Sequence, residues 1–351
     1  MIGSPLSKLP VPRVADRGFG NVTICIAALA SSGEKIVVAT DRKVAFGVFS
    51  ADSAVQKTEP IIERNMVLIA GNDVARSGTI FNKARTRLRE SWSRDANVIA
   101  ETLFEECNAE RDRIIEASVL RKRGFTWEMF RKQGNSLCTE AVYYEIESEI
   151  ADVRLSLDFL IAGFDETETP HLRYTNWCTP PENYDSLGFY AIGTGANSAI
   201  GSLAHAVEYL HFNKRMAVED VVYHVLAAKF MSESAQDVGR DTFLAVAGKG
   251  IPDAKTESER KNIFFLSLFG AIDFIRERWE KEGAPRVPKG ITAAIKDLLV
   301  SADEIKTSEF DIFERSAKHT PEAKKLMRRF KKAYEAFKST RSDSQKSEPA
   351  Q

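Results

Sequence analysis

The chain has 351 residues, of which 43% are hydrophobic and 28% are charged, and its formal net charge is -1. This composition is that of a globular protein, and the near-zero charge disfavours nucleic acid and anionic membrane surfaces as partners. The most apolar run, residues 263–275, is interrupted by Ser267 and Asp273 and falls short of the ~18 apolar residues that span a bilayer. We therefore expect no membrane-spanning segment.

The cysteines indicate neither a metal site nor a disulfide framework. They are scattered, with no Cys-x-x-Cys pair and no histidine at ligand spacing, and free thiols suit a reducing compartment. The N-terminus lacks the apolar segment of a secretory signal. We therefore expect a cytoplasmic protein. The four cysteines are Cys25, Cys107, Cys138 and Cys178.

The first 22 residues differ in composition and apolar patterning from the rest of the chain. They contain three prolines and three glycines without apolar periodicity, and such a composition does not build a packed core. We expect residues 1–22 to be a disordered leader, a propeptide or a segment that is not translated in the cell.

From residue 23 onward, groups of strands alternate with pairs of helices. β-branched apolar runs at 23–29 and 35–39 flank Ser31-Ser32-Gly33-Glu34, which is typical of a hairpin. Apolar residues at three- and four-residue spacing, such as Phe81 and Leu88, predict helices. The expected elements are strands 23–29, 35–39, 44–49 and 66–70, helices 77–92 and 97–120, a basic irregular segment 121–138, strands 157–163, 172–176 and 189–192, helices 197–209 and 218–231, and a strand 243–247.

This order predicts an α+β fold. Grouped strands with hairpin turns favour antiparallel sheets, and each helix pair must cover a sheet face. We expect residues 23–250 to form a four-layer α/β/β/α sandwich of two antiparallel sheets. A doubly wound parallel fold would need strict alternation of strand and helix, which the sequence lacks.

Residues 251–338 read as a helical extension, and residues 339–351 as a disordered tail. Helical patterns cover 263–279, 290–299 and 321–337. The last of these has its apolar residues on one face and is otherwise rich in Lys and Arg.

One kind of chemistry connects several residues of the first domain. A threonine hydroxyl is a weak nucleophile, but the α-amine of an N-terminal threonine can take its proton, because that amine titrates near 7.7–8.0. A nearby lysine favours the deprotonated forms of both groups, and a carboxylate orients the lysine. A backbone N–H, best on a glycine, stabilises the tetrahedral oxyanion.

Three stretches carry a resemblance to a known family. Thr23-Ile24-Cys25-Ile26-Ala27 and Val37-Val38-Ala39-Thr40-Asp41-Arg42 resemble the opening hairpin of proteasome β subunits, which are N-terminal-nucleophile (Ntn) hydrolases. Phe159-Leu160-Ile161-Ala162-Gly163-Phe164-Asp165 resembles their mid-chain strand. The resemblance covers about residues 23–248. It is strongest to the bacterial single-gene proteasome-like hydrolases, whose chains begin Met-Thr-Val-Cys-Ile-Ala-Ala.

The resemblance implies a role for each matching residue. Thr23 matches the nucleophile if the hairpin turn carries a two-residue insertion, and Asp41 matches the catalytic aspartate. Lys57 follows sixteen residues later and Gly71 fourteen after that, at the family spacing of the catalytic lysine and the oxyanion-hole glycine. The candidates completing the set are Thr194, in Gly193-Thr194-Gly195, and Ser234 and Asp237, which match only loosely. Thr194 also suits the N-cap of the helix that follows.

The resemblance further implies a threonine peptidase or amidohydrolase that acts on peptides or proteins. It implies a ring-like homo-oligomer without metal or organic cofactor, and leaves an unfoldase or ATPase partner open. Thr23 is internal, and Val22 precedes it. Translation could start at the codon of Val22, which would then be read as methionine. Removal of that methionine would expose Thr23 as the first residue. Two alternatives remain: a catalytically inactive structural subunit, and a transpeptidase or ligase that uses the same acyl-enzyme.

Overall fold

The computed structural model describes residues 23–46, 49–51, 57–91, 93–235, 238–249, 263–265, 271–282 and 287–303. The expected leader (1–22), helix 321–337 and tail 339–351 lie outside the described residues, and so does Asp237. Over the described ranges the protein is of the α+β class with two antiparallel five-stranded sheets, which confirms the expected class.

The first sheet is built on the hairpin of β1 (Cys25–Ala30) and β2 (Lys35–Asp41). The chain reverses through three consecutive positive φ angles, at Ser31 (51°), Ser32 (59°) and Gly33 (88°). The strand order is β10-β1-β2-β11-β12, with β10 at Phe189–Ile192, β11 at Thr242–Gly248 and β12 at Ile263–Phe265.

The second sheet runs in chain order. It contains β5 (Thr58–Ile62), β6 (Asn65–Gly71), β7 (Leu157–Phe164), β8 (Pro170–Asn176) and β9 (Glu182–Asn183). β6 ends at Gly71, which lies opposite Leu157 of β7. A separate two-stranded pair consists of β3 (Val44–Phe46) and β4 (Phe49–Ala51).

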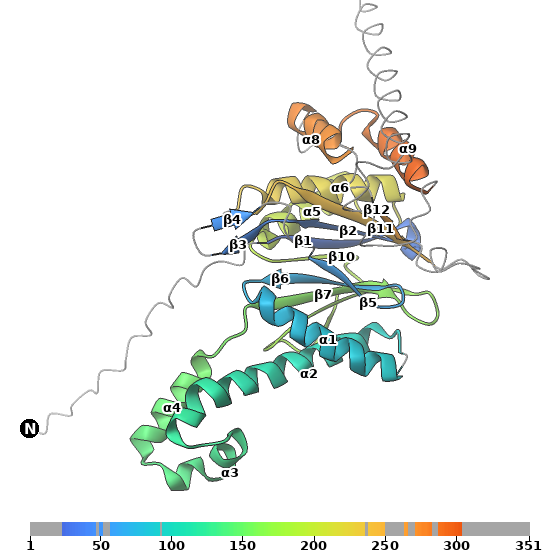
Figure 1. Cartoon of the computed structure of the whole chain (residues 1–351). Helices are drawn as coiled ribbons and strands as arrows, with labels where there is room; N and C mark the ends of the chain where they lie inside the picture. The colour runs from blue at the N-terminus through green and yellow to red at the C-terminus, as the bar shows by residue number, and fades with distance from the viewer. Residues whose placement is uncertain are drawn as a thin grey trace, which may run out of the picture.

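The two sheets lie face to face, and a pair of helices covers the outer face of each (Figure 1). α5 (Ala196–Leu210) and α6 (Val218–Ser232) cover the first sheet, while α1 (Val74–Ser91) and α2 (Ala96–Ile115) cover the second. Separate apolar clusters fill the three spaces between these four layers.

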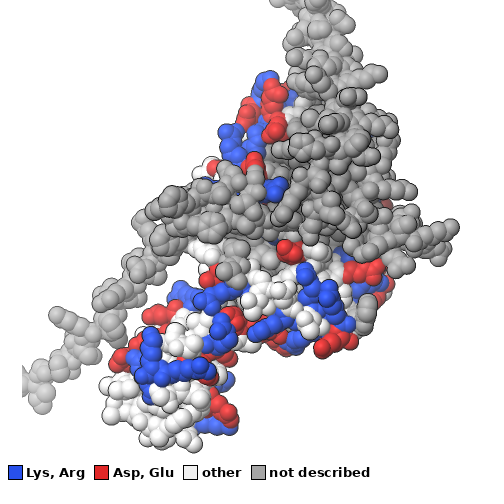
Figure 2. All heavy atoms as spheres, in the orientation of Figure 1, with Lys and Arg blue, Asp and Glu red and all other residues white. Residues whose placement is uncertain are grey.

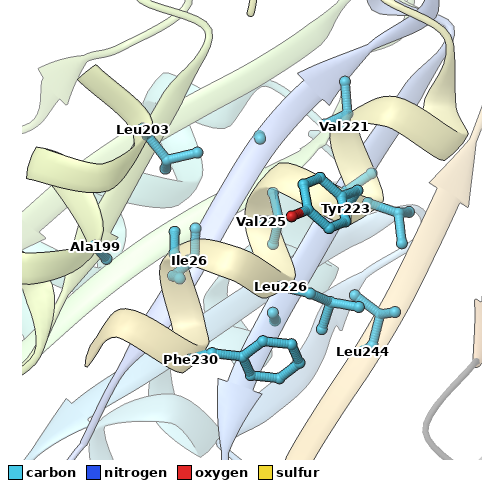
Figure 3. Close-up of a cluster of buried hydrophobic side chains, with 14 of the residues drawn as sticks. Ile26, Ala199, Leu203, Val221, Tyr223, Val225, Leu226, Phe230 and Leu244 are labelled. Atoms are coloured by element: carbon cyan, nitrogen blue, oxygen red, sulfur yellow. The ribbon is translucent and has the colours of Figure 1, made fainter. Parts of the chain in front are cut away.

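Side-chain alternation places β1 in two of these clusters at once. Ile26 and Ala28 pack toward α5 and α6, whereas Cys25, Ala27 and Leu29 pack between the sheets. Both faces of β1 are therefore buried, which explains its continuous apolar sequence. Figure 3 shows the cluster on the helix side, where Ile26 lies among side chains of α5, α6 and β11.

A helical arm projects from the far end of α2 (Figure 1). A π-helical turn (Glu116–Leu120) and a 3-10 turn (Arg121–Arg123) lead to α3 (Trp127–Leu137) and α4 (Glu140–Asp152), and we call residues 116–152 the arm. The arm encloses a small core of its own, separate from the clusters of the sandwich. Figure 2 shows Lys and Arg interspersed with Asp and Glu over the visible face of the arm and of α1 and α2.

The described residues beyond 250 belong to the same core as the sandwich. β12 extends the first sheet, while α8 (Ala271–Glu282) and α9 (Ile291–Asp303) cover α6. Because α6 has the sheet on one side and these helices on the other, it is buried nearly all round, and its apolar residues do not form a single stripe.

Three expected elements were wrong. Residues 44–49 are not one strand but parts of β3 and β4. The segment 121–138 is not irregular, because Thr126 caps α3 by accepting a hydrogen bond from Met129 N (3.1 Å) and Phe130 anchors the helix in the arm core. The expected helix 263–279 begins instead as β12, since a short apolar run suits either state and pairing with β11 favours the strand.

Two further differences concern elements that the sequence pattern did not show, α4 and β5. Neither has a clean apolar period: α4 buries only Ile146 and Ile150, and β5 contains Pro60. Among the described residues, no helix is both long and apolar enough to cross a membrane.

If α8 folds as part of the sandwich, truncating its most buried side chain should destabilise the whole protein. Ile275 is 1% exposed, so Ile275→Ala should lower the free energy of unfolding by about 2–5 kcal/mol. The control Val287→Ala, at a residue 40% exposed, should change it by no more than about 0.5 kcal/mol. Urea titration followed by tryptophan fluorescence measures both, and an early separate transition in Ile275→Ala would contradict a shared core.

Candidate active site

Thr23, Asp41 and Lys57 meet at one end of the sandwich. Thr23 lies just before β1, Asp41 ends β2, and Lys57 lies just before β5 in the opposite sheet. Lys57 Nζ is 2.5 Å from Thr23 Oγ1 and 2.7 Å from Asp41 Oδ1. All three side chains are buried. Both sheets therefore contribute to this site, and the structure brings together three of the residues that the resemblance selected.

Asp41 uses both carboxylate oxygens. Oδ1 accepts hydrogen bonds from Ile24 N (2.9 Å) and Lys57 Nζ (2.7 Å), and Oδ2 accepts one from Gly239 N (3.0 Å). Asp41 N also donates to Ile24 O (3.1 Å), which fixes the aspartate beside the residue after Thr23. A buried ion pair is stable only when its remaining hydrogen-bonding capacity is used, and Asp41 meets that condition.

Lys57 is directed at the threonine hydroxyl. Its own carbonyl accepts from Ile69 N (2.8 Å), which anchors the residue to β6. An ammonium that donates to Oγ1 favours a developing alkoxide there, while Asp41 sets the direction of the ammonium. The arrangement can therefore activate a hydroxyl nucleophile once a base takes its proton.

Gly71 occupies a position that only glycine fits. Its φ is +137°, and an added Cβ would lie 1.9 Å from Ser156 O. Alternate N–H groups of a strand point to the same edge, and that of Ile69 points toward β5, where it meets Lys57 O. The Gly71 N–H, two residues further along, is therefore directed to the same edge beyond the start of β5.

The Gly193-Thr194-Gly195 turn packs directly against Thr23. Gly195 N donates to Thr23 O (3.3 Å), and a Cβ on Gly193, whose φ is +99°, would lie 2.4 Å from that same oxygen. Gly195, not Thr194, is the N-cap of α5. Thr194 Oγ1 is buried and has no hydrogen-bond partner among the described residues.

Ser234 is not brought to this site. It is exposed just after α6, and its hydroxyl donates to Met231 O (2.8 Å). Gly239 is a residue that sequence reasoning missed, although it lies in the stretch 232–241 where partners of the threonine were expected. The only sequence feature that could have indicated Gly239 is a glycine shortly before a strand, and that feature is too common to select one residue.

The cysteine next to the site is unsuited to act as the nucleophile. Cys25 is fully buried, and its Sγ lies 3.6 Å from Ile69 O. Burial raises the pKa of the Cys25 thiol, outweighing the opposite effect of Lys57. The thiol is therefore protonated at neutral pH, and Thr23 is the better candidate.

No group of three or more His, Cys, Asp or Glu side chains within the described ranges is placed to hold a metal ion. Comparison of the chain with protein-family models and with curated proteins gave no match. The geometry of the residues around Thr23 is therefore the basis for the function proposed below.

Replacing Gly71 should be costly, whereas replacing a glycine with open space around it should not. Gly71→Ala forces a side chain into a positive-φ position and against Ser156 O, so it should destabilise the fold by at least about 1–3 kcal/mol. Gly78→Ala in α1 is the control, because nothing lies within 4 Å of its added Cβ and alanine favours a helix by about 1 kcal/mol. In thermal melting, Gly71→Ala should have a lower melting temperature than the wild type, and Gly78→Ala should not. Equal melting temperatures for the two variants would refute the close approach of Gly71 to Ser156 O.

Proposed function

We propose that this protein is an N-terminal-nucleophile amidohydrolase of the proteasome-like class, with peptides or proteins as substrates. The observation that carries the proposal is the contact of Thr23 Oγ1 with Lys57 Nζ at 2.5 Å, with Asp41 behind the lysine. Two facing antiparallel sheets between helix layers provide the framework expected of the Ntn-hydrolase fold. The proposal also includes a cytoplasmic location and a ring-like homo-oligomer.

The reaction would begin with a free Thr23 α-amine. The amine takes the hydroxyl proton while Oγ1 attacks the substrate carbonyl carbon, and the Gly71 N–H stabilises the resulting oxyanion. When the C–N bond breaks, the α-ammonium returns the proton to the leaving amine, and an ester to Thr23 remains. Water, activated by the same amine, then hydrolyses the ester and restores the hydroxyl.

The amine exists only if Thr23 is the first residue, and in the 351-residue chain Val22 precedes it. A cut between Val22 and Thr23 would meet this requirement, and so would translation that starts at position 22 if the initiator methionine is then removed. The internal position of Thr23 favours one second candidate, a catalytically inactive structural subunit of a proteasome-like assembly. Transfer of the acyl group to an amine instead of water would give a ligase.

The first test asks whether Thr23 reacts. A chain with Thr23 at its N-terminus should form one covalent adduct with a peptide epoxyketone, seen as a mass increase in intact-protein mass spectrometry. Thr23→Ala should give none. Thr139→Ala, which removes an exposed threonine hydroxyl of the arm that makes no capping hydrogen bond, should react normally. An adduct that persists in Thr23→Ala would refute the assignment, and an unreactive Thr23 chain would favour the structural subunit.

The second test concerns the lysine. Lys57→Ala removes the charge beside Thr23 Oγ1, so the rate of adduct formation should fall by at least about 100-fold, as for other acid–base groups. Lys57→Arg should not restore the rate, because the planar guanidinium is larger than the ammonium that fits between Thr23 and Asp41. A Lys57→Ala protein that reacts at the original rate would show that the hydroxyl is activated in another way.

A further inference from the structure

A buried lysine lies at the end of α6, outside the group that contacts Thr23. The side chain of Lys229 is 0% exposed. Its ammonium donates to Glu233 Oε1 (2.5 Å), Gly239 O (2.8 Å) and Arg240 O (2.8 Å), which uses all three of its protons. An apolar side chain of similar length would fill this space without the cost of desolvating a charge. We therefore ask what the charge of Lys229 does for the three groups that accept its hydrogen bonds, which are Glu233, Gly239 O and Arg240 O.

Gly239 connects Lys229 with the candidate active site. Its carbonyl accepts from Lys229, and its N–H donates to Asp41 Oδ2 at 3.0 Å. Asp41 Oδ1 is the atom that accepts from Lys57. Because Gly239 holds the second oxygen, its position sets the plane of the carboxylate and thereby the direction in which Oδ1 faces Lys57.

Glu233 and Arg240, which both contact Lys229, are also held from α8. Arg276 binds Glu233 through two hydrogen bonds, Nη1 to Oε2 (2.5 Å) and Nη2 to Oε1 (2.8 Å), and Nη2 also donates to Arg240 O (2.8 Å). The guanidinium lies over the ring of Phe230, 4.3 Å from its centroid. Glu233 is therefore shared between a lysine of α6 and an arginine of α8, and both cations contact the backbone of Arg240.

The electrostatics of this network favour a charged Lys229. Burial lowers the pKa of Lys229 to about 8, and Glu233 opposes that shift. The ammonium therefore keeps its proton at pH 7, where it can serve all three acceptors.

We propose that Lys229, Glu233 and Arg276 form a clamp that positions Gly239, and through it Asp41 and Lys57, so that the reactivity of Thr23 depends on α8. The three are positioning residues, since their hydrogen bonds within the described ranges reach Gly239 and Arg240 and not Thr23. Their proposed effect on reactivity rests on the proposed function, whereas their hold on residues 238–240 does not. Among the described residues beyond 250, α8 then helps to position the reacting groups of the site.

Two measurements on one set of variants test the clamp. Hydrogen–deuterium exchange on the 351-residue chain reports how firmly residues 238–240 are held, whether or not the protein is active. The rate of epoxyketone adduct formation, on the form with a free Thr23 amine, reports the position of the reacting groups. The variants are Arg276→Met, Arg276→Lys, which keeps the charge, and Glu233→Gln, which keeps the shape. Arg278→Met is the matched control, because Arg278 lies on the same helix with similar burial but contacts Glu282 and Lys289.

Arg276→Met and Glu233→Gln should speed exchange in peptides covering 238–240 and slow adduct formation by up to about 100-fold, as small misplacements of reacting groups do. Arg276→Lys should show smaller effects on both, and Arg278→Met should match the wild type. Unchanged exchange in Arg276→Met would overturn the clamp. Faster exchange with unchanged adduct formation would overturn its link to Asp41. A wild type that exchanges slowly here but never reacts would refute the proposed function and, with it, the role in reactivity.

Discussion

The buried ion pair between Lys57 and Asp41 joins the two sheets at one end of the sandwich. Lys57 lies just before the first strand of the second sheet, and Asp41 ends a strand of the first. Their 2.7 Å contact therefore fixes how the two facing sheets are placed relative to each other at this end. Separating the pair would leave a buried charge without its partner, which costs far more than a surface ion pair gains. The packing of the apolar layer between the sheets and the geometry around Thr23 are thus parts of one constraint.

Close backbone packing near the site requires glycine at two positions. Gly71 and Gly193 each lie where a methyl group would collide with backbone atoms, those of Ser156 and of Thr23 respectively. Glycine at these points lets the end of β6 lie against Ser156 and the 193–195 turn lie against Thr23. Two backbone N–H groups, those of Ile24 and Gly239, therefore act together with the side chains of Thr23, Asp41 and Lys57 in this site.

Much of this could be predicted from the sequence because it depends on local patterns or on fixed spacing. The β1–β2 hairpin follows from two β-branched runs around a turn. Asp41, Lys57 and Gly71 follow from the resemblance to proteasome β subunits, whose spacing their separations match. The arm and β12 were not predicted correctly, since their short apolar runs carry no distinct period. The contacts of Lys229 with Gly239 and of Arg276 with Glu233 join segments whose partners are set only by tertiary packing. A lone lysine in a helical pattern gives no hint of burial.

The arm leaves the sandwich and returns to it at nearly the same place. Arg111 of α2 marks that place, since its guanidinium donates to Ile150 O and Val153 O, each at 2.9 Å, just before the chain enters β7. To the sandwich, the whole segment is therefore equivalent to a single closed connection between α2 and β7. The entropic cost of closing such a connection, expressed as a free energy, rises by only about 0.6 kcal/mol for each doubling of its length. A segment with its own core can accordingly be gained, lost or exchanged at this point while the geometry around Thr23 stays the same.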